Sequence, residues 1–492
     1  MSTEWRIYGR SVLFVLITAV QELYYGAEVV VQFSANKGLF CELCHLPVPL
    51  DEDVVRAIEG KMRQIVAEDR PLVKKSMLRE DAVQLFKRNK QIEKANLIAA
   101  LDRETVSVYC CGNYEDYLYG KLCPSTGELG HFELDYEPPG ILLRMPGQYT
   151  YAKLEIPRRV PQPKFSQTLA ESKEWAKILQ CRYVTDLNRA NRQGRMGEVI
   201  RVSEALQEKT IARIADHIAD HRDRLRLILI AGPSSSGKTS FAQRLRVQLL
   251  VNGLRPVSIS LDDYFKNRVD TPKNEAGEYD YECLEALDTE LFNEQMVSLL
   301  KGESVDLPHY NFLTGLSERG GGRHLLVAPD QPIIVEGIHG LNEKLSELVP
   351  RERKHKIYIS ALTQLNIDAH NRIPTTSARL LRRLVRDYQF RGAHALKTLH
   401  QWPAVREGEE KYIFPFQEEA DFMFNSALIY ELGILKRYAE PLLETVSPEV
   451  PEYETARRLL DFCQYFAPIA QEDEVPNNSI LREFIGKSVF FK

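Results

Sequence analysis

The chain has 492 residues and a formal net charge of −5, with 44% hydrophobic and 27% charged residues. This length predicts about three domains, and the composition is that of an ordinary globular protein with enough apolar residues for a core. The negative charge argues against a surface that coats nucleic acid, although it leaves room for local basic patches.

The N-terminal region holds two patterns that favour export. An apolar run, 11–20, follows Arg6 and Arg10, and residues 41–45 match the haem-attachment pattern C-x-x-C-H. However, the run has no small-residue cleavage site, is too short to span a bilayer and continues into a helix and a strand. The eight cysteines are sparse and lack a regular framework, as in cytosolic proteins with reduced thiols. We therefore expect a cytoplasmic protein with no membrane segment.

Residues 1–155 are predicted to form a mixed α+β domain. Apolar residues at helical spacing predict helices over 51–69 and 79–91. The segments 104–112 and 130–137 are typical of strands, with a turn at 123–130 between them.

A helical linker is predicted over 156–221, after a proline-rich boundary at 157–163. Near its end His217 and His221 lie one helical turn apart, a spacing that can bind metal. A solvated amphipathic helix is the favoured interpretation, because no Glu-rich or Cys-rich motif lies nearby.

Residues 222–440 are predicted to form a doubly wound parallel α/β sheet of the P-loop NTPase class. Four short apolar runs with helical segments between them, typical of buried parallel strands, support this fold class. They occupy 226–232, 256–263, 331–337 and 356–362. The remaining residues, 441–492, are predicted to form a helical tail.

A phosphate-binding loop follows the first of these runs. Gly232, Gly237, Lys238 and Thr239 fit the spacing G-x-x-x-x-G-K-[ST] between a strand and an amphipathic helix. Backbone N–H groups of such a loop hold the phosphates of ATP, the lysine reaches the β and γ oxygens, and the hydroxyl ligates Mg²⁺. The predicted ATP-binding residues of the loop are Gly232, Ser234, Ser235, Ser236, Gly237, Lys238, Thr239 and Ser240.

Carboxylates follow the next two predicted strands. Asp262 and Asp263 come after the second, and Glu336 ends the third. At the carboxyl edge of a parallel sheet such groups can accept a proton from an attacking hydroxyl or ligate Mg²⁺. Thr239, Asp262 and Glu336 are therefore the predicted metal ligands, and turn capping is the alternative role for the carboxylates.

Five arginines crowd the segment 376–392. All but Arg391 largely share one helix face, and without matching carboxylates the five suit a lid that closes over phosphates. A solvated basic face or an RNA-facing patch is the alternative. The five are Arg379, Arg382, Arg383, Arg386 and Arg391.

These elements, in this order, resemble the uridine/cytidine kinase and phosphoribulokinase group of P-loop kinases over residues 225–440. "GPSSSGKTS" is close to the uridine kinase loop, and "LDDYF", "YDYECLEALD", "VDLPHYNF" and "RLLRRLVRD" resemble later family segments. The resemblance implies ATP and Mg²⁺ as cofactors and transfer of the γ-phosphoryl group to a primary hydroxyl. It implies a catalytic base at Asp262, acting with Lys238 and Arg383. It further implies ATP contacts at Arg386 and Arg391, and acceptor contacts at Asp263, Tyr264, Phe265, Asp280 and Tyr310.

Two departures from this family bear on the acceptor. The uridine kinases carry a base-contacting histidine after the "YNF" position, where Gly315 stands here. The segment 359–380 is also longer than the family's connection from strand to lid. The identity of the acceptor therefore stays open.

Residues 10–145 resemble the editing domain, or second additional domain, of threonyl-tRNA synthetases. "AVQELYYGAEVVVQF" and "PSTGELGHFEL" carry the resemblance. Where that family has its H-x-x-x-H and C-x-x-x-H pairs, this chain has Arg10 with Phe14 and Leu118 with Leu122. We therefore expect no editing chemistry. Small-molecule sensing, RNA binding without catalysis, docking between subunits and a scaffold or dimerisation role stay open.

Three functional hypotheses follow. The first is an ATP-dependent nucleoside kinase of the uridine/cytidine type. The second is a sugar or sugar-phosphate kinase of the phosphoribulokinase type, which Lys266 and Arg268 after "DDYF" leave open. The third is an RNA-binding regulatory protein that uses ATP as a switch, which the net charge disfavours. We favour the first, with ATP and a small-molecule hydroxyl acceptor as partners and the oligomeric state undetermined.

Overall fold

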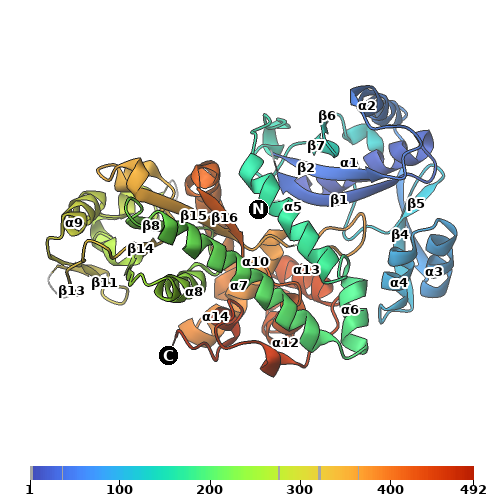
Figure 1. Cartoon of the computed structure of the whole chain (residues 1–492). Helices are drawn as coiled ribbons and strands as arrows, with labels where there is room; N and C mark the ends of the chain where they lie inside the picture. The colour runs from blue at the N-terminus through green and yellow to red at the C-terminus, as the bar shows by residue number, and fades with distance from the viewer. Residues whose placement is uncertain (1–3, 36, 275–276, 320–322, 364, 492) are drawn as a thin grey trace.

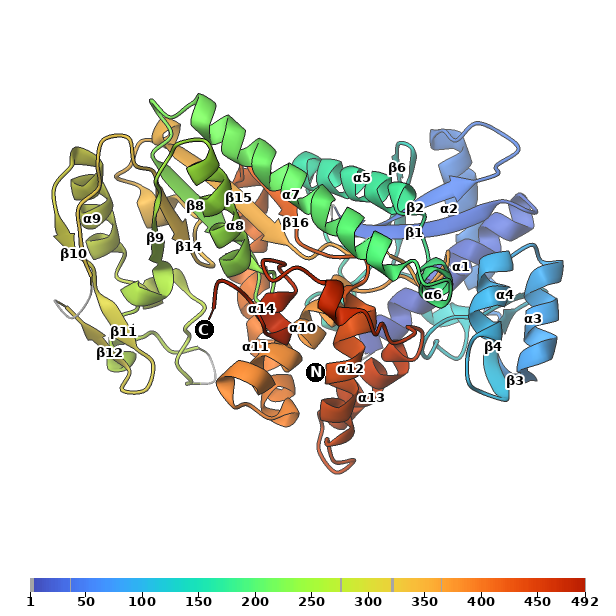
Figure 2. The same cartoon turned by 60° about the horizontal axis from the view of Figure 1, so that its bottom comes forward.

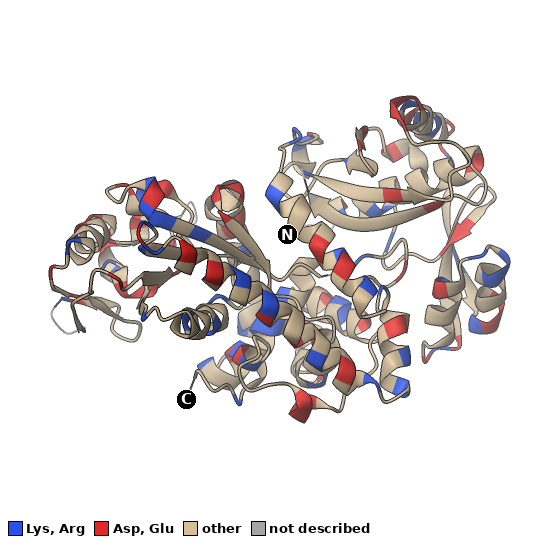
Figure 3. Ribbon diagram, in the orientation of Figure 1, with Lys and Arg blue, Asp and Glu red and all other residues tan. Residues whose placement is uncertain are grey.

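The computed structural model describes residues 4–35, 37–274, 277–319, 323–363 and 365–491. Figure 1 shows two parts, with the N-terminal part on the right and a parallel sheet flanked by helices on the left. Helices α5 and α7 run between them. In the ribbon of Figure 3, acidic and basic residues are interspersed over both parts.

The N-terminal part is α+β, as predicted. It contains two antiparallel sheets, of strand orders β1-β2-β7-β6 and β3-β4-β5. All four segments predicted here as helix or strand have the expected type. The elements are α1 (Glu4–Leu23), β1 (Glu28–Ala35), β2 (Gly38–Cys44), α2 (Glu52–Ala67), β3 (Leu72–Leu78), α3 (Arg79–Arg88), α4 (Ile92–Ala99), β4 (Thr105–Cys111), β5 (Tyr114–Asp116), β6 (Glu133–Glu137) and β7 (Gly140–Arg144).

Helix α1 forms the centre of this part's core. Its residues 11–20 are all buried, and the apolar ones among them pack against α2 and both sheets. The apolar run near the N-terminus is thus a core helix that is covered on all sides. Among the described residues, no helix combines the length and the apolar character needed to cross a bilayer.

Three helices follow: α5 (Pro163–Ile178), α6 (Val184–Arg192) and α7 (Met196–Asp220). Helix α7 packs along α8 (Lys238–Val251), the helix after the phosphate loop. Arg244 of α8 pairs with Glu208 of α7 at 2.6 Å, which fixes the register of the two helices.

The C-terminal part is built on a five-stranded, fully parallel sheet of order β16-β15-β8-β14-β9. This confirms the doubly wound P-loop fold class. The four predicted strands are present, and β16 was not predicted. The strands are β8 (Leu227–Ala231), β9 (Val257–Ser260), β14 (Ile333–Glu336), β15 (Lys354–Ser360) and β16 (Phe422–Asn425), with smaller pairs formed by β10 (Val305–Asp306), β11 (His309–Asn311), β12 (Leu316–Glu318) and β13 (His324–Leu325).

Helices cover both faces of this sheet. Ile228 and Ile230 of β8 belong to the core that contains α8, whereas Leu227 and Leu229 belong to the core that contains α9. This alternation is the period of two that a strand buried on both faces requires. The remaining helices are α9 (Thr289–Lys301), α10 (Thr375–Arg391), α11 (Ala395–Tyr412), α12 (Glu431–Glu444), α13 (Tyr453–Cys463) and α14 (Arg482–Ile485).

The long connection between β15 and α10 joins the two parts. The backbone N–H of Val31 in β1 donates to the carbonyl oxygen of Ala369 at 2.8 Å. Asn366 donates to the Val31 carbonyl at 2.7 Å and accepts from the N–H of Val184 at 2.9 Å. The added length of this connection, noted from the sequence, therefore places it against the N-terminal sheet.

Candidate active site

The phosphate loop connects β8 to α8, and its backbone lies close to that of β15. A Cβ atom on Gly232 would lie 2.0 Å from the carbonyl oxygen of Ile359 in β15, so a side chain would force the loop off the neighbouring strand. Gly237 is the N-cap of α8 and has a φ of +87°, a conformation that glycine adopts without steric cost. Geometry thus accounts for both glycines of the motif.

Lys238 begins α8 and supplies the positive charge of the loop. Its Nζ donates to the carbonyl oxygen of Gly232 at 2.8 Å. Burial lowers the pKa of this ammonium, and the nearby carboxylates of Glu336, Glu483 and Asp262 act in the opposite direction. Together with the N–H groups at the start of α8, which have no partner within the helix, Lys238 makes a site suited to phosphate.

Two predicted carboxylates reach the same edge of the sheet. Glu336 ends β14 and pairs in register with Ile230 of β8 and Ser260 of β9. Gly232 and Asp262 each follow two residues after one of these partners. The loop, Asp262 and Glu336 therefore meet at the carboxyl ends of three adjacent strands, where ligands of doubly wound folds bind.

This group of oxygen donors fits a magnesium ion. Burial raises the pKa of Glu336 to about 7 against the opposing charge of Lys238, and a hydrogen bond with the Thr239 hydroxyl lowers it. Burial also raises the pKa of Asp262, although part of this residue remains accessible to solvent. One hydroxyl and two carboxylates are donors that Mg²⁺ prefers, and the ion would neutralise charge on phosphoryl oxygens.

A cluster of aromatic rings follows Asp262 in the chain. The ring centroid of Phe265 lies 5.4 Å from that of Tyr310 and 5.9 Å from that of Tyr281. Phe312 lies 5.0 Å from Tyr310 and is 62% exposed, so the cluster reaches solvent. Such rings offer apolar faces on which a flat ligand can stack.

Polar groups border this aromatic cluster. The carboxylate of Asp263 lies 3.2 Å from Nδ1 of His309, and Asp280 accepts a hydrogen bond from the Tyr412 hydroxyl at 3.2 Å. Asp263, Phe265, Asp280 and Tyr310 are thus placed in one region, beside the end of β9.

The structure does not bring Tyr264 to this region. Its ring packs against Phe292 with centroids 5.1 Å apart, and its hydroxyl donates to Gln295 at 2.8 Å. It is 1% exposed and belongs to the core beneath the sheet. The prediction that Tyr264 contacts the acceptor is corrected on this ground, because the η3 turn (Leu261–Tyr264) directs it inward while Phe265 faces the cluster.

Several residues near the acceptor region were missed from the sequence. Tyr281, Glu282, His309 and Phe312 adjoin predicted residues in "YDYE" and "HYNF", so extending each motif by one or two positions would have found them. Burial raises the pKa of Glu282 to about 7, and the neighbouring carboxylate of Glu409 acts in the same direction.

Two of the five arginines predicted to face phosphates are internal. Arg379 pairs with Glu409, and Arg382 pairs with Glu431. Both guanidinium groups also donate to backbone carbonyl oxygens of the loop, Arg379 to that of Ser234 and Arg382 to that of Ser235. Both are at most 1% exposed. The expectation of unpaired lid charges was wrong for these two, because their carboxylate partners lie 30 and 49 residues later. They fasten the loop in place.

The other three arginines share one carboxylate, that of Asp387. Arg383, Arg386 and Arg391 lie 3.2, 3.1 and 3.6 Å from its oxygens. Arg383 also donates to the hydroxyl of Ser234 at 2.8 Å, which places it on the loop. These three remain the candidate phosphate-contacting groups.

The C-terminal segment adds a carboxylate that no motif indicated. Glu483 accepts hydrogen bonds from the backbone N–H of Ser240 at 3.1 Å and from its hydroxyl at 2.8 Å. Ser240 is the third residue of α8, so this carboxylate lies at the start of the phosphate-loop helix.

The positions that correspond to the editing pairs come together in the N-terminal part. The guanidinium of Arg10 donates to the carbonyl oxygens of Tyr119 at 3.0 Å and Lys121 at 3.1 Å. Phe14 and Leu118 are buried in the same core. An arginine and apolar side chains thus occupy this place.

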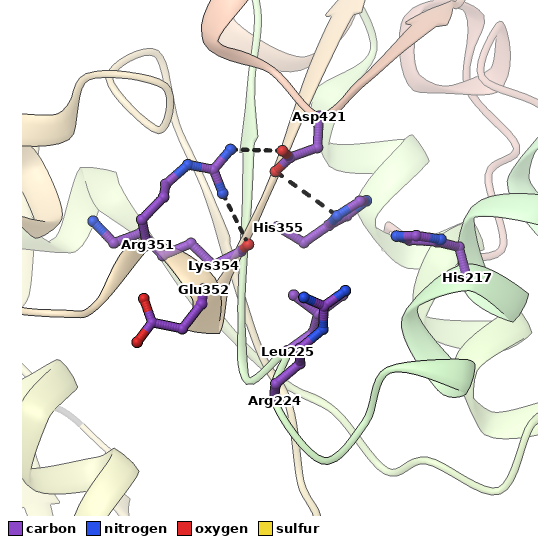
Figure 4. A pocket seen from close by; sticks show the side chains of 8 residues that line it. All are labelled: His217, Arg224, Leu225, Arg351, Glu352, Lys354, His355 and Asp421. Atoms are coloured by element: carbon purple, nitrogen blue, oxygen red, sulfur yellow. Dashed lines mark hydrogen bonds and ion pairs between the residues drawn. The ribbon is translucent and has the colours of Figure 1, made fainter.

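A separate hollow of about 390 Å³ lies at the opposite, amino-terminal edge of the parallel sheet (Figure 4). Its basic residues are largely paired, Arg351 with Asp421 at 2.6 Å and Lys354 with Glu343 at 2.5 Å. Because it lies away from the phosphate loop, it is not part of the candidate active site.

The histidine pair noted from the sequence borders this hollow. The ring of His217 lies 4.5 Å from that of His221 and 5.3 Å from that of His355, centroid to centroid. Within the described part of the chain, no three His, Cys, Asp or Glu side chains are arranged to hold a metal.

Residues 227–429 match the model of the Phosphoribulokinase / Uridine kinase family. The match begins at β8 and includes the loop, both strand-end carboxylates, the aromatic cluster and α10.

The N-terminal region is similar to threonine–tRNA ligases. The ligase of Polaromonas naphthalenivorans is 36% identical over 125 residues, which is 25% of this chain and 20% of the ligase. That of Rhodospirillum rubrum is 38% identical over 117 residues, 24% of this chain and 18% of the ligase. The chain spans about a fifth of the length of these relatives.

Among solved structures, that of a possible uridine kinase from Bacillus stearothermophilus is similar to the C-terminal part. It is 20% identical, the match covers 41% of this chain and 89% of that chain, and the TM-score is 0.27. The fold assignment rests on the strand order and the phosphate loop described above.

Proposed function

We propose that this chain is an ATP-dependent kinase that transfers the γ-phosphoryl group to a hydroxyl group of a nucleoside. One observation carries the proposal: the short segment 262–265 contributes both to the phosphate-binding region around Lys238 and to the aromatic cluster. Asp262 faces the charge of Lys238, whereas Phe265, three residues later, belongs to the aromatic cluster. A hydroxyl acceptor stacked on that cluster would thus lie next to the phosphates.

The residues have distinct roles in this proposal. Asp262 orients the acceptor hydroxyl and takes its proton as the oxygen attacks the γ phosphorus, and ADP leaves. A carboxylate whose pKa is raised by burial is a better proton acceptor than an ordinary one. Lys238 and Arg383 stabilise the transferred group through their charges.

The acceptor region supports an uncharged, ring-bearing acceptor over a sugar phosphate. Its basic residues are engaged with the backbone: Lys266 donates to the carbonyl of Glu285 at 2.9 Å, and Arg268 to that of Phe312 at 3.0 Å. Asp263 and Asp280 add negative charge nearby, which disfavours a second phosphate.

The N-terminal part fits a scaffold role in this proposal. It holds the connection that leads into α10, the helix of the phosphate-contacting arginines, through backbone hydrogen bonds to β1. The arginine and apolar groups at the editing positions offer no nucleophile or base for hydrolysis.

The purified full chain tests the proposal in an ADP-release assay with Mg²⁺ and ATP. The acceptor panel contains nucleosides, free sugars, inositols and ribulose 5-phosphate. We expect release to rise with at least one nucleoside and to be lost in Asp262→Asn. The proposal fails if no nucleoside stimulates release, or if Asp262→Asn keeps the stimulated rate.

A further inference from the structure

The C-terminal segment 476–491 lies against the phosphate loop. Figure 2 shows α14 beside α8 and α10, and α14 is in contact with α10. A Cβ atom on Gly237 would lie 2.4 Å from Cγ2 of Ile480, so the segment packs directly on the loop's second glycine. Gly486, further along, lies beside Gln389 and Phe390 near the end of α10.

The backbone of this segment is firmly held. The Ser479 hydroxyl donates to Glu204 of α7 at 2.5 Å, and Arg482 donates to the carbonyl of Val475 at 2.8 Å. Phe484 is fully buried and lies beneath the guanidinium of Arg382 at 5.0 Å. The segment therefore presents the Glu483 side chain to α8 from a fixed position.

Glu483 binds a group that a nucleotide phosphate also requires. The first N–H groups of a helix have no partner within the helix, and together with the helix dipole they attract anions. In a phosphate loop these N–H groups hold nucleotide phosphates. The N–H of Ser240 is one of them, and it donates to Glu483 here. A phosphate and a carboxylate cannot share this N–H, because their negative charges repel at such short range.

We propose that Glu483 is a built-in competitor of nucleotide phosphate at the start of α8, so that nucleotide binding requires its carboxylate to leave Ser240. The inference rests on the proposed ATP site and adds regulation of that site by the C-terminal segment. Because the backbone is anchored, the displacement is a rotation of the Glu483 side chain. Any partner that draws this carboxylate away would raise the affinity for nucleotide.

If Glu483 is only a structural cap of α8, its removal should have a different effect on nucleotide affinity. If Glu483 only stabilised the start of α8, its removal would lower the stability of the fold and leave nucleotide affinity unchanged or weakened. Affinity for nucleotide, measured beside thermal stability, separates the two roles.

The experiment is calorimetric titration of the full chain with Mg²⁺·ATP for wild type, Glu483→Gln and Glu483→Asp. Glu483→Gln removes the charge, and Glu483→Asp keeps the charge but shortens its reach. We expect both to bind ATP about tenfold more tightly than wild type. Glu474→Gln is the matched control: Glu474 also belongs to the C-terminal region but pairs with Arg201 at 2.5 Å. Its affinity should equal that of wild type.

Equal or weaker binding of ATP by both folded Glu483 variants would overturn the inference and leave the kinase proposal standing. Absence of ATP binding in all four proteins would instead overturn the proposed function together with this inference. A thermal melt of each variant without nucleotide confirms that the comparison is between folded proteins.

Discussion

Nδ1 of His370 lies 2.5 Å from the carboxylate of Asp116, although the two residues belong to different parts of the molecule. Asp116 ends β5 in the N-terminal part, and His370 lies in the connection between β15 and α10. Lys94 of α4 also pairs with Asp116, and its Nζ lies 2.9 Å from Nδ1 of His370. Against the effect of burial, the interactions with Lys94 and His370 hold the pKa of Asp116 well below its ordinary value.

This buried cluster predicts a large cost for Asp116→Asn. The substitution removes the nearer carboxylate of the buried Lys94 ammonium and leaves only that of Asp368, at 4.0 Å, which costs about 3–5 kcal/mol in the free energy of unfolding. Urea unfolding at pH 7 measures it. Glu115→Gln is the control, since its partner Lys75 is 52% exposed, and it should cost less than about 1 kcal/mol. A loss below about 1 kcal/mol for Asp116→Asn would show that the cluster does not join the two parts.

The raised pKa of Glu336 predicts that this carboxyl group destabilises the fold at high pH. The folded state holds the proton up to about pH 7, whereas an ordinary glutamate releases it near 4.5, so stability falls as pH rises between these values. Without Mg²⁺, Glu336→Gln should therefore be more stable than wild type at pH 8, by up to about 3 kcal/mol.

Thermal melts at pH 4 and pH 8 check this, and at pH 4 the two proteins should unfold alike. A variant that is no more stable than wild type at pH 8 would contradict the pKa. The same titration predicts that affinity for Mg²⁺ falls below pH 7 in wild type, because protonation removes the ligand charge.

The contact of Gly232 with β15 predicts that Gly232→Ala is destabilising. The new methyl group would meet the carbonyl oxygen of Ile359, and such overpacking costs about 1–3 kcal/mol. The matched control is Gly60→Ala in α2, where a Cβ atom would have nothing within 4 Å. There we expect a gain of about 0.5–1 kcal/mol from helix propensity. Denaturant melts measure the free energy of unfolding of both variants. Equal changes in the two would argue against the close contact at Gly232.

Asp262→Asn should lower kcat by a factor of about 10²–10⁴, the usual contribution of a positioned base. The affinity for ATP should change little, because the loop and Lys238 are intact. Stopped assays with a nucleoside acceptor give kcat, and calorimetry gives the ATP affinity. Asp306→Asn is the control, since Asp306 lies on β10 and is paired with His324 of β13. Equal kcat values for the two variants would remove Asp262 from the mechanism.

Local features of the site could be predicted from the sequence. The loop residues are contiguous, and a strand that ends at a carboxylate places it at a known edge, so the sequence could place Lys238, Asp262 and Glu336 at one edge of the sheet. Tyr264 was misplaced because neighbouring side chains in a short turn point in opposite directions, which a motif does not reveal.

Long-range partners could not be predicted. The carboxylates of Glu409 and Glu431, which neutralise Arg379 and Arg382, come from helices far along the chain. Glu483 reaches Ser240 across 243 positions without any local signal. Such pairings depend on how the helices pack, and only the folded chain reveals them.

The most direct test of the central claim is mass spectrometry of the product formed from Mg²⁺·ATP by the full chain. Uridine, cytidine, adenosine and guanosine are compared with ribulose 5-phosphate as acceptors. The proposal predicts a nucleoside monophosphate from at least one nucleoside, formed with one ADP per product and absent in Asp262→Asn. The proposal would be contradicted if ribulose 5-phosphate is phosphorylated and no nucleoside is. It would also be contradicted if ATP is only hydrolysed to ADP and free phosphate.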